Sequence, residues 1–169
     1  MSKKKITVAQ SDTETRATSS HAQELRLWLR MLACTNLIEG EIRSRLRNQF
    51  SITLPRFDLM SQLERAPDGM KMGELSKRMM VTGGNVTGIT DQLVAEGLVV
   101  RLDNPNDRRA YNVKLTTEGR KAFMKMAVAH EKWIVELLGH LNEKERDQFY
   151  LLLAKLKSHV SSLPASVRP

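Results

Sequence analysis

The segment MGELSKRMMVTGGNVTGITDQLVAEG, residues 72–97, carries two short helical patterns with a tight connection between them. Apolar residues at helical spacing predict one helix over residues 72–80 and a second over residues 84–96. Residues 81–83 form the connection, and Gly97 suits the left-handed position that commonly ends a helix. The segment therefore predicts a helix–turn–helix unit.

The residues that follow this unit alternate in the way a half-buried hairpin does. Residues 98–102 are rich in β-formers, and in residues 111–115 Tyr, Val and Leu alternate with polar side chains. Asp, Asn and Pro at residues 103–106 supply turn chemistry between the two strands. Thr116 or Thr117 is expected to cap the helix that follows. A helix–turn–helix followed at once by a hairpin is a winged helix-turn-helix.

Long helical patterns flank this core on both sides. One runs over residues 24–50, and others run from residue 117 to about 140 and from Asn142 to about 160. A helix of about 25 residues is too long for a compact core alone, so part of it is expected to pack on a second subunit. A short helix over 55–63 leads into the loop 66–70.

The fold class is thus mostly α with a small β-hairpin wing. The winged helix-turn-helix core spans about residues 55–116, and dimerisation helices span about 24–50 and 117–160. Together they form a single domain over residues 23–160. Residues 1–22 are polar and lack periodicity, which predicts a disordered basic tail.

Composition narrows the classes of function. The 27 Lys and Arg residues outnumber the 19 Asp and Glu residues, and the net charge of +8 favours a polyanionic partner such as nucleic acid. No apolar run approaches the ~18 residues of a membrane-spanning helix, and no secretory signal is present. The chain is therefore expected to be cytoplasmic, with no membrane partner.

Catalytic and metal chemistry lack their usual motifs. The sequence has no Gly-rich phosphate loop and no nucleophile elbow, and its four histidines are far apart. We expect no enzymatic activity, no metal and no cofactor. The single cysteine, Cys34, excludes an intramolecular disulfide, and we expect it to be a small buried residue rather than a redox sensor.

The second helix of the unit offers a polar face. With Val86, Ile89 and Leu93 directed inward, helical geometry directs the opposite side outward. Asn and Gln side chains have the donor–acceptor pairs that suit adenine, and glycines let a backbone come close. A solvated polar face accounts for the same pattern, and tight helix packing accounts for the glycines equally well. The outward residues are Gly84, Asn85, Gly88 and Gln92, with Thr87 and Asp91 beside them.

At this point the sequence resembles a known family, the MarR family of bacterial transcription regulators. Three motifs carry the resemblance: the helix L-S-x-x-M, the block N-V-T-x-x-x-D-x-L-x-x-x-G-L-V-x-R, and the wing D-x-P-x-D-R-R closed by V-x-L-T. The likeness covers about residues 24–160. It implies a homodimer that reads a palindromic operator in double-stranded DNA, with half-sites ~10 bp apart.

The resemblance also implies roles for particular residues. Thr82, Asn85, Thr87 and the face around Gly88 would meet the major groove. Of the two wing arginines, Arg108 and Arg109, one would reach the minor groove and the other would bind phosphate or an Asp. Many relatives have a basic residue at the position of Gly88, so this departure is expected to change operator preference.

The family commonly binds phenolic or aromatic carboxylates between its dimerisation helices and its DNA-binding part. By resemblance, methionines and arginines around that junction are candidates for an effector site. Ordinary core filling by methionine, and a solvated or DNA-facing basic patch, are the alternatives. The candidate effector residues are Trp28, Met31, Arg43, Arg47, Arg56, Met60 and Met124.

The predicted function is therefore a ligand-responsive transcription regulator that binds a palindromic operator as a homodimer. We expect a repressor that a small aromatic acid or its coenzyme A thioester releases. A non-specific architectural DNA-binding protein and a scaffold that uses the winged domain for protein contacts are the alternatives. Competition between the promoter and random duplex DNA separates the first two.

Overall fold

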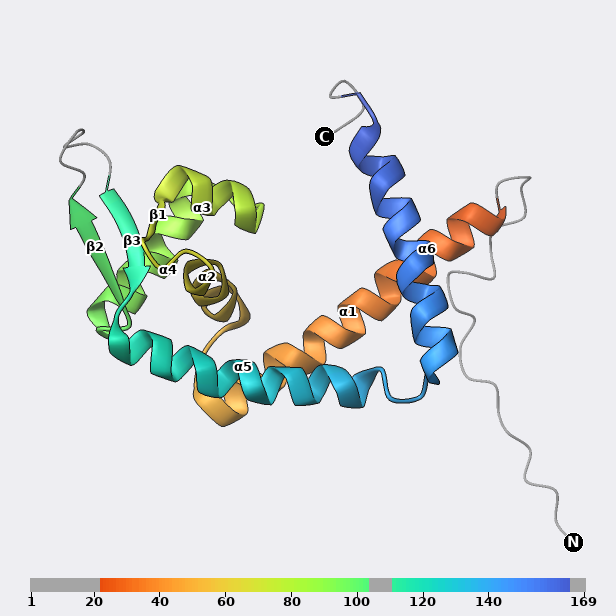
Figure 1. Cartoon of the computed structure of the whole chain (residues 1–169), viewed down its shortest axis with the longest axis horizontal. Helices are drawn as coiled ribbons and strands as arrows, with labels where there is room; N and C mark the ends of the chain where they lie inside the picture. Colours follow the sequence, from red (N-terminus) through yellow and green to blue (C-terminus); the bar gives the residue numbers. More distant parts are fainter. Residues whose placement is uncertain (1–21, 104–110, 165–169) are drawn as a thin grey trace, which may run out of the picture. The chain divides into compact units, whose positions relative to one another are not determined.

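The computed structural model describes residues 22–103 and 111–164 (Figure 1). The chain divides into two compact units, Met1–Ala127 and Val128–Pro169. The helices are α1 (Ala22–Phe50), α2 (Leu54–Glu64), α3 (Met72–Met79), α4 (Gly83–Ala95), α5 (Thr117–Leu137) and α6 (Glu143–Ser162). The predicted mostly helical class with a small wing is confirmed.

The strands form an antiparallel sheet in the order β1-β3-β2. Strand β2 (Val99–Asp103) pairs with β3 (Tyr111–Leu115), so that Val99 faces Leu115 and Asp103 faces Tyr111. The two long strands project beyond α3 and α4 as the wing (Figure 1). The prediction that Asp103 belongs to the turn is wrong, because Asp103 still pairs within the ladder.

Strand β1 (Met70–Lys71) is an element that the sequence did not predict. Residues 66–70 were expected to be a loop, but Met70 pairs with Val113 at the edge of the hairpin. Gly69 adopts a φ of +94°, which turns the chain back toward β3. Met70 is then almost fully buried. A strand of two residues has no period to recognise, and its buried side chain alone gives it away.

The core of the first unit lies between α2, α3, α4 and the sheet. Its fully buried side chains come from five elements, so the helix–turn–helix is held by packing rather than by helix propensity. The rings of Phe57 on α2 and Phe123 on α5 lie 5.5 Å apart, centroid to centroid. The fully buried residues are Leu46, Leu59, Met60, Leu63, Leu75, Val86, Thr90, Leu93 and Val113.

A tight joint connects the end of α4 to the start of α5. The Thr116 hydroxyl donates to the Gly97 carbonyl at 2.8 Å and accepts the Gly119 N–H at 2.9 Å. The Thr116 N–H donates to the Leu98 carbonyl at 3.1 Å. Thr116 is therefore the residue that caps α5, and it also ties the hairpin base to that helix.

Helix α6 of the second unit begins with a complete capping box. The Asn142 side chain accepts the Glu145 N–H at 3.1 Å, and the Glu145 carboxylate accepts the Asn142 N–H at 2.8 Å. The predicted cap is confirmed. Beyond it, the large apolar side chains at Phe149, Leu152 and Leu156 are exposed in the single chain.

The first half of α1 is likewise exposed. Leu25, Trp28 and Leu32 expose large apolar surfaces, whereas Ile42 and Leu46 in the second half are buried. The expectation that Cys34 is buried is wrong, because this residue lies in the exposed half. In the part of the chain that the structure describes, no helix has the length and apolar character of a membrane span.

Candidate nucleic-acid interface

The turn between α3 and α4 is set by one left-handed residue. Met80, with φ 54° and ψ 37°, ends α3 and donates its N–H to the Lys77 carbonyl at 3.2 Å. The next N–H, that of Val81, donates to the Ser76 carbonyl at 3.2 Å. These two bonds satisfy the last carbonyls of α3 and reverse the chain into α4.

Helix α4 begins with an N-terminus that is free to meet an anion. Thr82 precedes it in an extended conformation, and its hydroxyl makes no capping hydrogen bond. The first turn carries no acidic residue, so nothing in the helix neutralises the partial positive charge of its N–H groups. This arrangement suits a phosphate group.

The exposed face of α4 is the one that the sequence predicted. Gly84, Asn85, Gly88 and Gln92 are all exposed, whereas Val86 and Leu93 are fully buried and Ile89 is half-buried. Their shared face can offer an amide from Asn85 and another from Gln92 to base edges.

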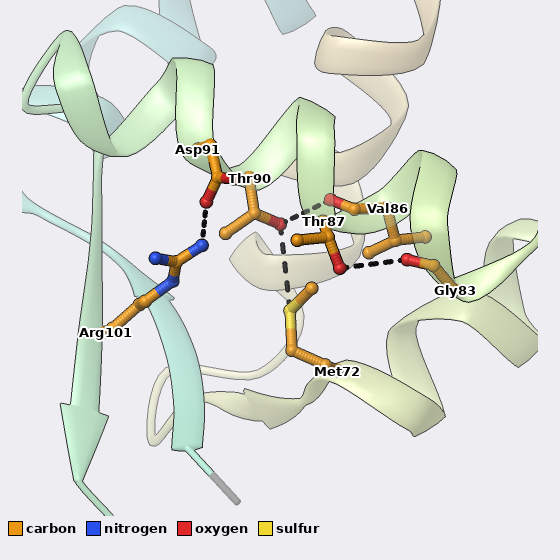
Figure 2. A network of polar contacts seen from close by, with 7 residues as sticks. All are labelled: Met72, Gly83, Val86, Thr87, Thr90, Asp91 and Arg101. Carbon is orange, nitrogen blue, oxygen red and sulfur yellow. Dashed lines mark hydrogen bonds and ion pairs between the residues drawn. The ribbon is translucent and has the colours of Figure 1, made fainter.

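Two threonines of α4 have different roles (Figure 2). Exposed Thr87 donates its hydroxyl proton to the Gly83 carbonyl at 3.0 Å, so toward an outside partner it acts as an acceptor. Fully buried Thr90 donates to the Val86 carbonyl at 2.8 Å and approaches the Met72 sulfur at 3.7 Å. The second contact joins α4 to the start of α3.

Packing inside the chain does not account for the glycines of α4. A Cβ built on Gly83, Gly84 or Gly88 meets nothing within 4 Å. Glycine in a helix interior costs about 1 kcal/mol relative to alanine. Of the two explanations that the sequence left open, the structure therefore favours a flat surface that an outside backbone can approach over packing within the chain.

One arginine links the wing to α4. Arg101 of β2 ion-pairs with Asp91 of α4, and its guanidinium carbon lies 4.8 Å from the centroid of the Tyr111 ring on β3 (Figure 2). These contacts fix the base of the hairpin against the helix. The sequence analysis quoted both charged residues in one motif but assigned no role to Arg101, because no helix or strand period relates residues ten positions apart across a turn.

The predicted wing contacts lie outside the described residues. Arg108 and Arg109 belong to the segment 104–110, which connects Asp103 of β2 to Tyr111 of β3. Their assignment as minor-groove or phosphate contacts remains a prediction.

The seven candidate effector residues are dispersed. Trp28 and Met31 lie in the first half of α1, and Met60 is fully buried in the core. Arg43 is exposed and pairs with Glu39 one turn earlier, and Arg47 and Met124 are also exposed.

A cavity of about 370 Å³ in the first unit brings in one of those candidates, Arg56. It lies where α1, α2, the start of β2 and α5 meet. Among the described residues, no group of three or more His, Cys, Asp or Glu side chains could hold a metal ion.

Comparison with known proteins relates this architecture to a family. A model of the MarR family matches residues 52–111, which include the helix–turn–helix. A solved MarR-family regulator from Silicibacter pomeroyi is 31% identical, and the match covers 85% of this chain and 99% of that one, with a TM-score of 0.72. The chain belongs to the MarR family. Such proteins are transcription regulators, not enzymes.

Other MarR relatives are similar over different extents. A mutant MarR from E. coli solved with operator DNA is 26% identical, with a TM-score of 0.70 and coverage of 82% of this chain and 99% of that one. The transcriptional regulator PrsX of Escherichia coli is 33% identical, and the repressor YetL of Bacillus subtilis is 32% identical. Each of these two matches covers about half of both chains, 53% and 54% for PrsX and 52% and 53% for YetL.

Proposed function

We propose that this MarR-family protein regulates transcription by placing α4 in the major groove of operator DNA. The observation that carries the proposal is the face of α4, where Asn85 and Gln92 are exposed beside glycines that have open space around them. The groove, about 12 Å wide, admits a helix. The free N-terminus at Thr82 would bind a phosphate, and Arg101 would hold the wing at a fixed angle to the helix.

The protein acts as a homodimer on a palindromic operator. Support comes from apolar side chains left exposed in the single chain, such as Trp28 on α1 and Leu152 on α6, which are 55% and 58% exposed. Apolar surface of this extent is typical of an interface between subunits. A two-fold dimer presents two copies of α4 to two half-sites about one helical turn apart.

Regulation is by repression that a small aromatic acid, or its coenzyme A thioester, relieves. YetL is named a repressor, and a dimer bound at a promoter blocks it sterically. The acid changes the spacing of the two α4 helices, and it can shift that equilibrium only by the difference between its affinities for the two states.

Competition binding tests the DNA-binding proposal. The labelled promoter upstream of the protein's own gene is bound at fixed salt, and unlabelled promoter or random duplex is added. A regulator should prefer its promoter by about a thousandfold or more. Equal competition by random duplex would instead indicate the architectural function, and salt-independent binding would contradict both.

Two variants separate the parts of the proposal. Asn85→Ala should lower affinity for the operator by about tenfold or more while random-duplex affinity stays constant, because only a base contact is lost. Leu152→Asp should shift the protein toward a monomer in sedimentation equilibrium, because a charge would enter the apolar interface. Its solvent-facing neighbour Lys155→Asp serves as the control for the added charge. A dimer that tolerates Leu152→Asp contradicts the proposed interface.

A further inference from the structure

The cavity of the first unit has an apolar floor and a charged rim. Ile52 and Met126 are buried in its wall, and Phe50, Leu98 and Ala122 also line it. Its volume of about 370 Å³ lies in the range of small-molecule sites. All of its lining residues belong to the unit that carries α4. A ligand here would therefore touch the DNA-binding unit directly.

Arg56 of α2 is the buried cation of this cavity. Its side chain is 12% exposed, and it forms an ion pair with Glu96, the residue that caps the C-terminus of α4. The Arg56 Nε is buried and has no hydrogen-bond partner among the described residues. A guanidinium carries five N–H donors in a planar fork, and an unmade bond to a buried donor is unfavourable. Arg56 is thus incompletely satisfied by Glu96.

Two lysines of α5 add to the positive charge of the rim. Lys121 and Lys125 are one turn apart, are exposed, and form no ion pair within the described parts of the chain. With Arg56 held by Glu96, these two cations face one further carboxylate, Glu118. The rim therefore has an excess of positive charge above an apolar floor.

We propose that this cavity binds a small amphipathic carboxylate, which competes with Glu96 for Arg56. The apolar body of the ligand lies on Ile52 and Met126, and its carboxylate accepts hydrogen bonds from Arg56 and the lysines. Guanidinium and carboxylate match in geometry, so the Arg56 Nε gains the partner it lacks. A whole coenzyme A thioester, with its nucleotide, is too large for this volume, which selects the free acid.

Competition for Arg56 gives the ligand a route to α4. Glu96 follows directly after Ala95, so its ion pair fixes the C-terminal end of that helix to α2. Release of Glu96 removes this restraint and lets the helix end move. This regulatory half rests on the proposed function, because it matters only if α4 binds DNA. The binding half stands without it.

The binding half is tested without DNA. The methyl signal of Met126 in isotope-labelled protein, assigned with Met126→Leu, reports occupancy of the cavity. Benzoate, phenylacetate and cinnamate are titrated, with benzamide as the neutral analogue. The acids should shift the Met126 signal and benzamide should not. The absence of a shift with all three acids overturns the proposal.

Three variants test the chemistry of recognition. Lys121→Gln with Lys125→Gln should weaken binding of the acids by about tenfold, because charged hydrogen bonds are lost. Glu96→Gln should tighten binding, because the competing charge is removed; a purely structural role for Glu96 predicts no gain. Lys132→Gln, further along α5, is the matched control. Equal affinity in all variants, or weaker binding in Glu96→Gln, overturns the proposal.

The regulatory half is tested with operator DNA. Saturating benzoate should lower operator affinity of the wild-type protein, and Glu96→Gln should lower it without any ligand. If the acids bind but operator affinity is unchanged, the regulatory half is wrong and the binding site stands. If the wild-type protein shows no preference for its operator, the proposed function fails, and the titration of Met126 still decides the site.

Discussion

Gly119 is the position where a single methyl group should do the most damage. A Cβ added there would lie 1.8 Å from the Leu98 carbonyl oxygen and 2.8 Å from the Leu98 carbonyl carbon, whereas real Cβ contacts under 3.0 Å are essentially never seen. Both atoms belong to backbone that cannot rotate away. Gly119→Ala must therefore move α5 away from the base of the hairpin by roughly 1.2 Å.

The magnitude follows from the contacts at that joint. Overpacking of this kind costs about 1–3 kcal/mol. The displacement also strains the hydrogen bonds of Thr116 with Gly97, Leu98 and Gly119, and each is worth about 1 kcal/mol. Alanine returns up to about 1 kcal/mol through better helix propensity. The net loss in free energy of unfolding should be about 2–4 kcal/mol.

Thermal and urea unfolding followed by circular dichroism measure this loss. For a chain of this size, 1 kcal/mol corresponds to about 2–4 °C, so the midpoint should fall by about 5–15 °C. Protein concentration is held equal, because a dimer unfolds at a concentration-dependent temperature. Gly73→Ala is the matched control: a Cβ on Gly73 meets nothing within 4 Å, so its midpoint should stay or rise slightly.

Equal midpoints for Gly119→Ala and the wild-type protein would refute the reasoning. Such a result would mean that the joint between Leu98 and α5 yields without loss of packing. A drop for Gly73→Ala as large as that for Gly119→Ala would also refute it, because sterics could then not be the cause.

Three further outcomes are expected. Arg101→Ala should weaken operator binding about tenfold, with the dependence of affinity on salt unchanged; a salt slope lower by about one would show that Arg101 binds phosphate instead of positioning the wing. Arg109→Ala should weaken operator binding several-fold and leave the dimer intact in sedimentation, and an unchanged affinity would reject a role in the wing contact. Burial, and then the negative charge of Glu39, raises the pKa of Asp58 above its ordinary value of 3.8. The contribution of Asp58 to stability is therefore full below pH 3.8 and is lost as pH rises through the raised pKa. Asp58→Asn should accordingly raise the urea midpoint at pH 7 and raise it less at pH 4, whereas exposed Asp68→Asn should change neither, and a lower midpoint at pH 7 would contradict the prediction.

The sequence predicted the elements of the winged unit because local patterns determine them. Val86 and Leu93 at helical spacing oriented α4, and the alternation around Val113 located β3. The exposed face of α4 followed from the same geometry. The capping box at Asn142 could be read because its two partners are three residues apart.

Contacts between distant segments could not be predicted in this way. Strand β1 exists because Met70 finds Val113, and Arg56 meets Glu96 forty positions away. No period links such pairs, so the cavity and its buried cation emerged only from the fold. The burial of Cys34 was mispredicted for a similar reason, since a small apolar residue on a helix shows nothing of which half of the helix the core covers.

Helix α4 is held at three levels along its length, and they differ in how readily an outside molecule can break them. Near its start, Val86 and Thr90 are fully buried in close packing, which resists small displacements. In its middle, Asp91 pairs with Arg101, a contact whose side chains are partly exposed and whose loss would free the wing rather than the helix. At its end, Glu96 depends on Arg56, which borders an open cavity and has an unused donor. Because the start is anchored by packing and the end by one ion pair, a ligand that alters α4 does so most easily as a tilt about its N-terminal half. A tilt of that kind would leave Thr82 in place while it moved Gln92, so the loss of operator affinity should be greater at the bases read by Gln92 than at those read by Asn85.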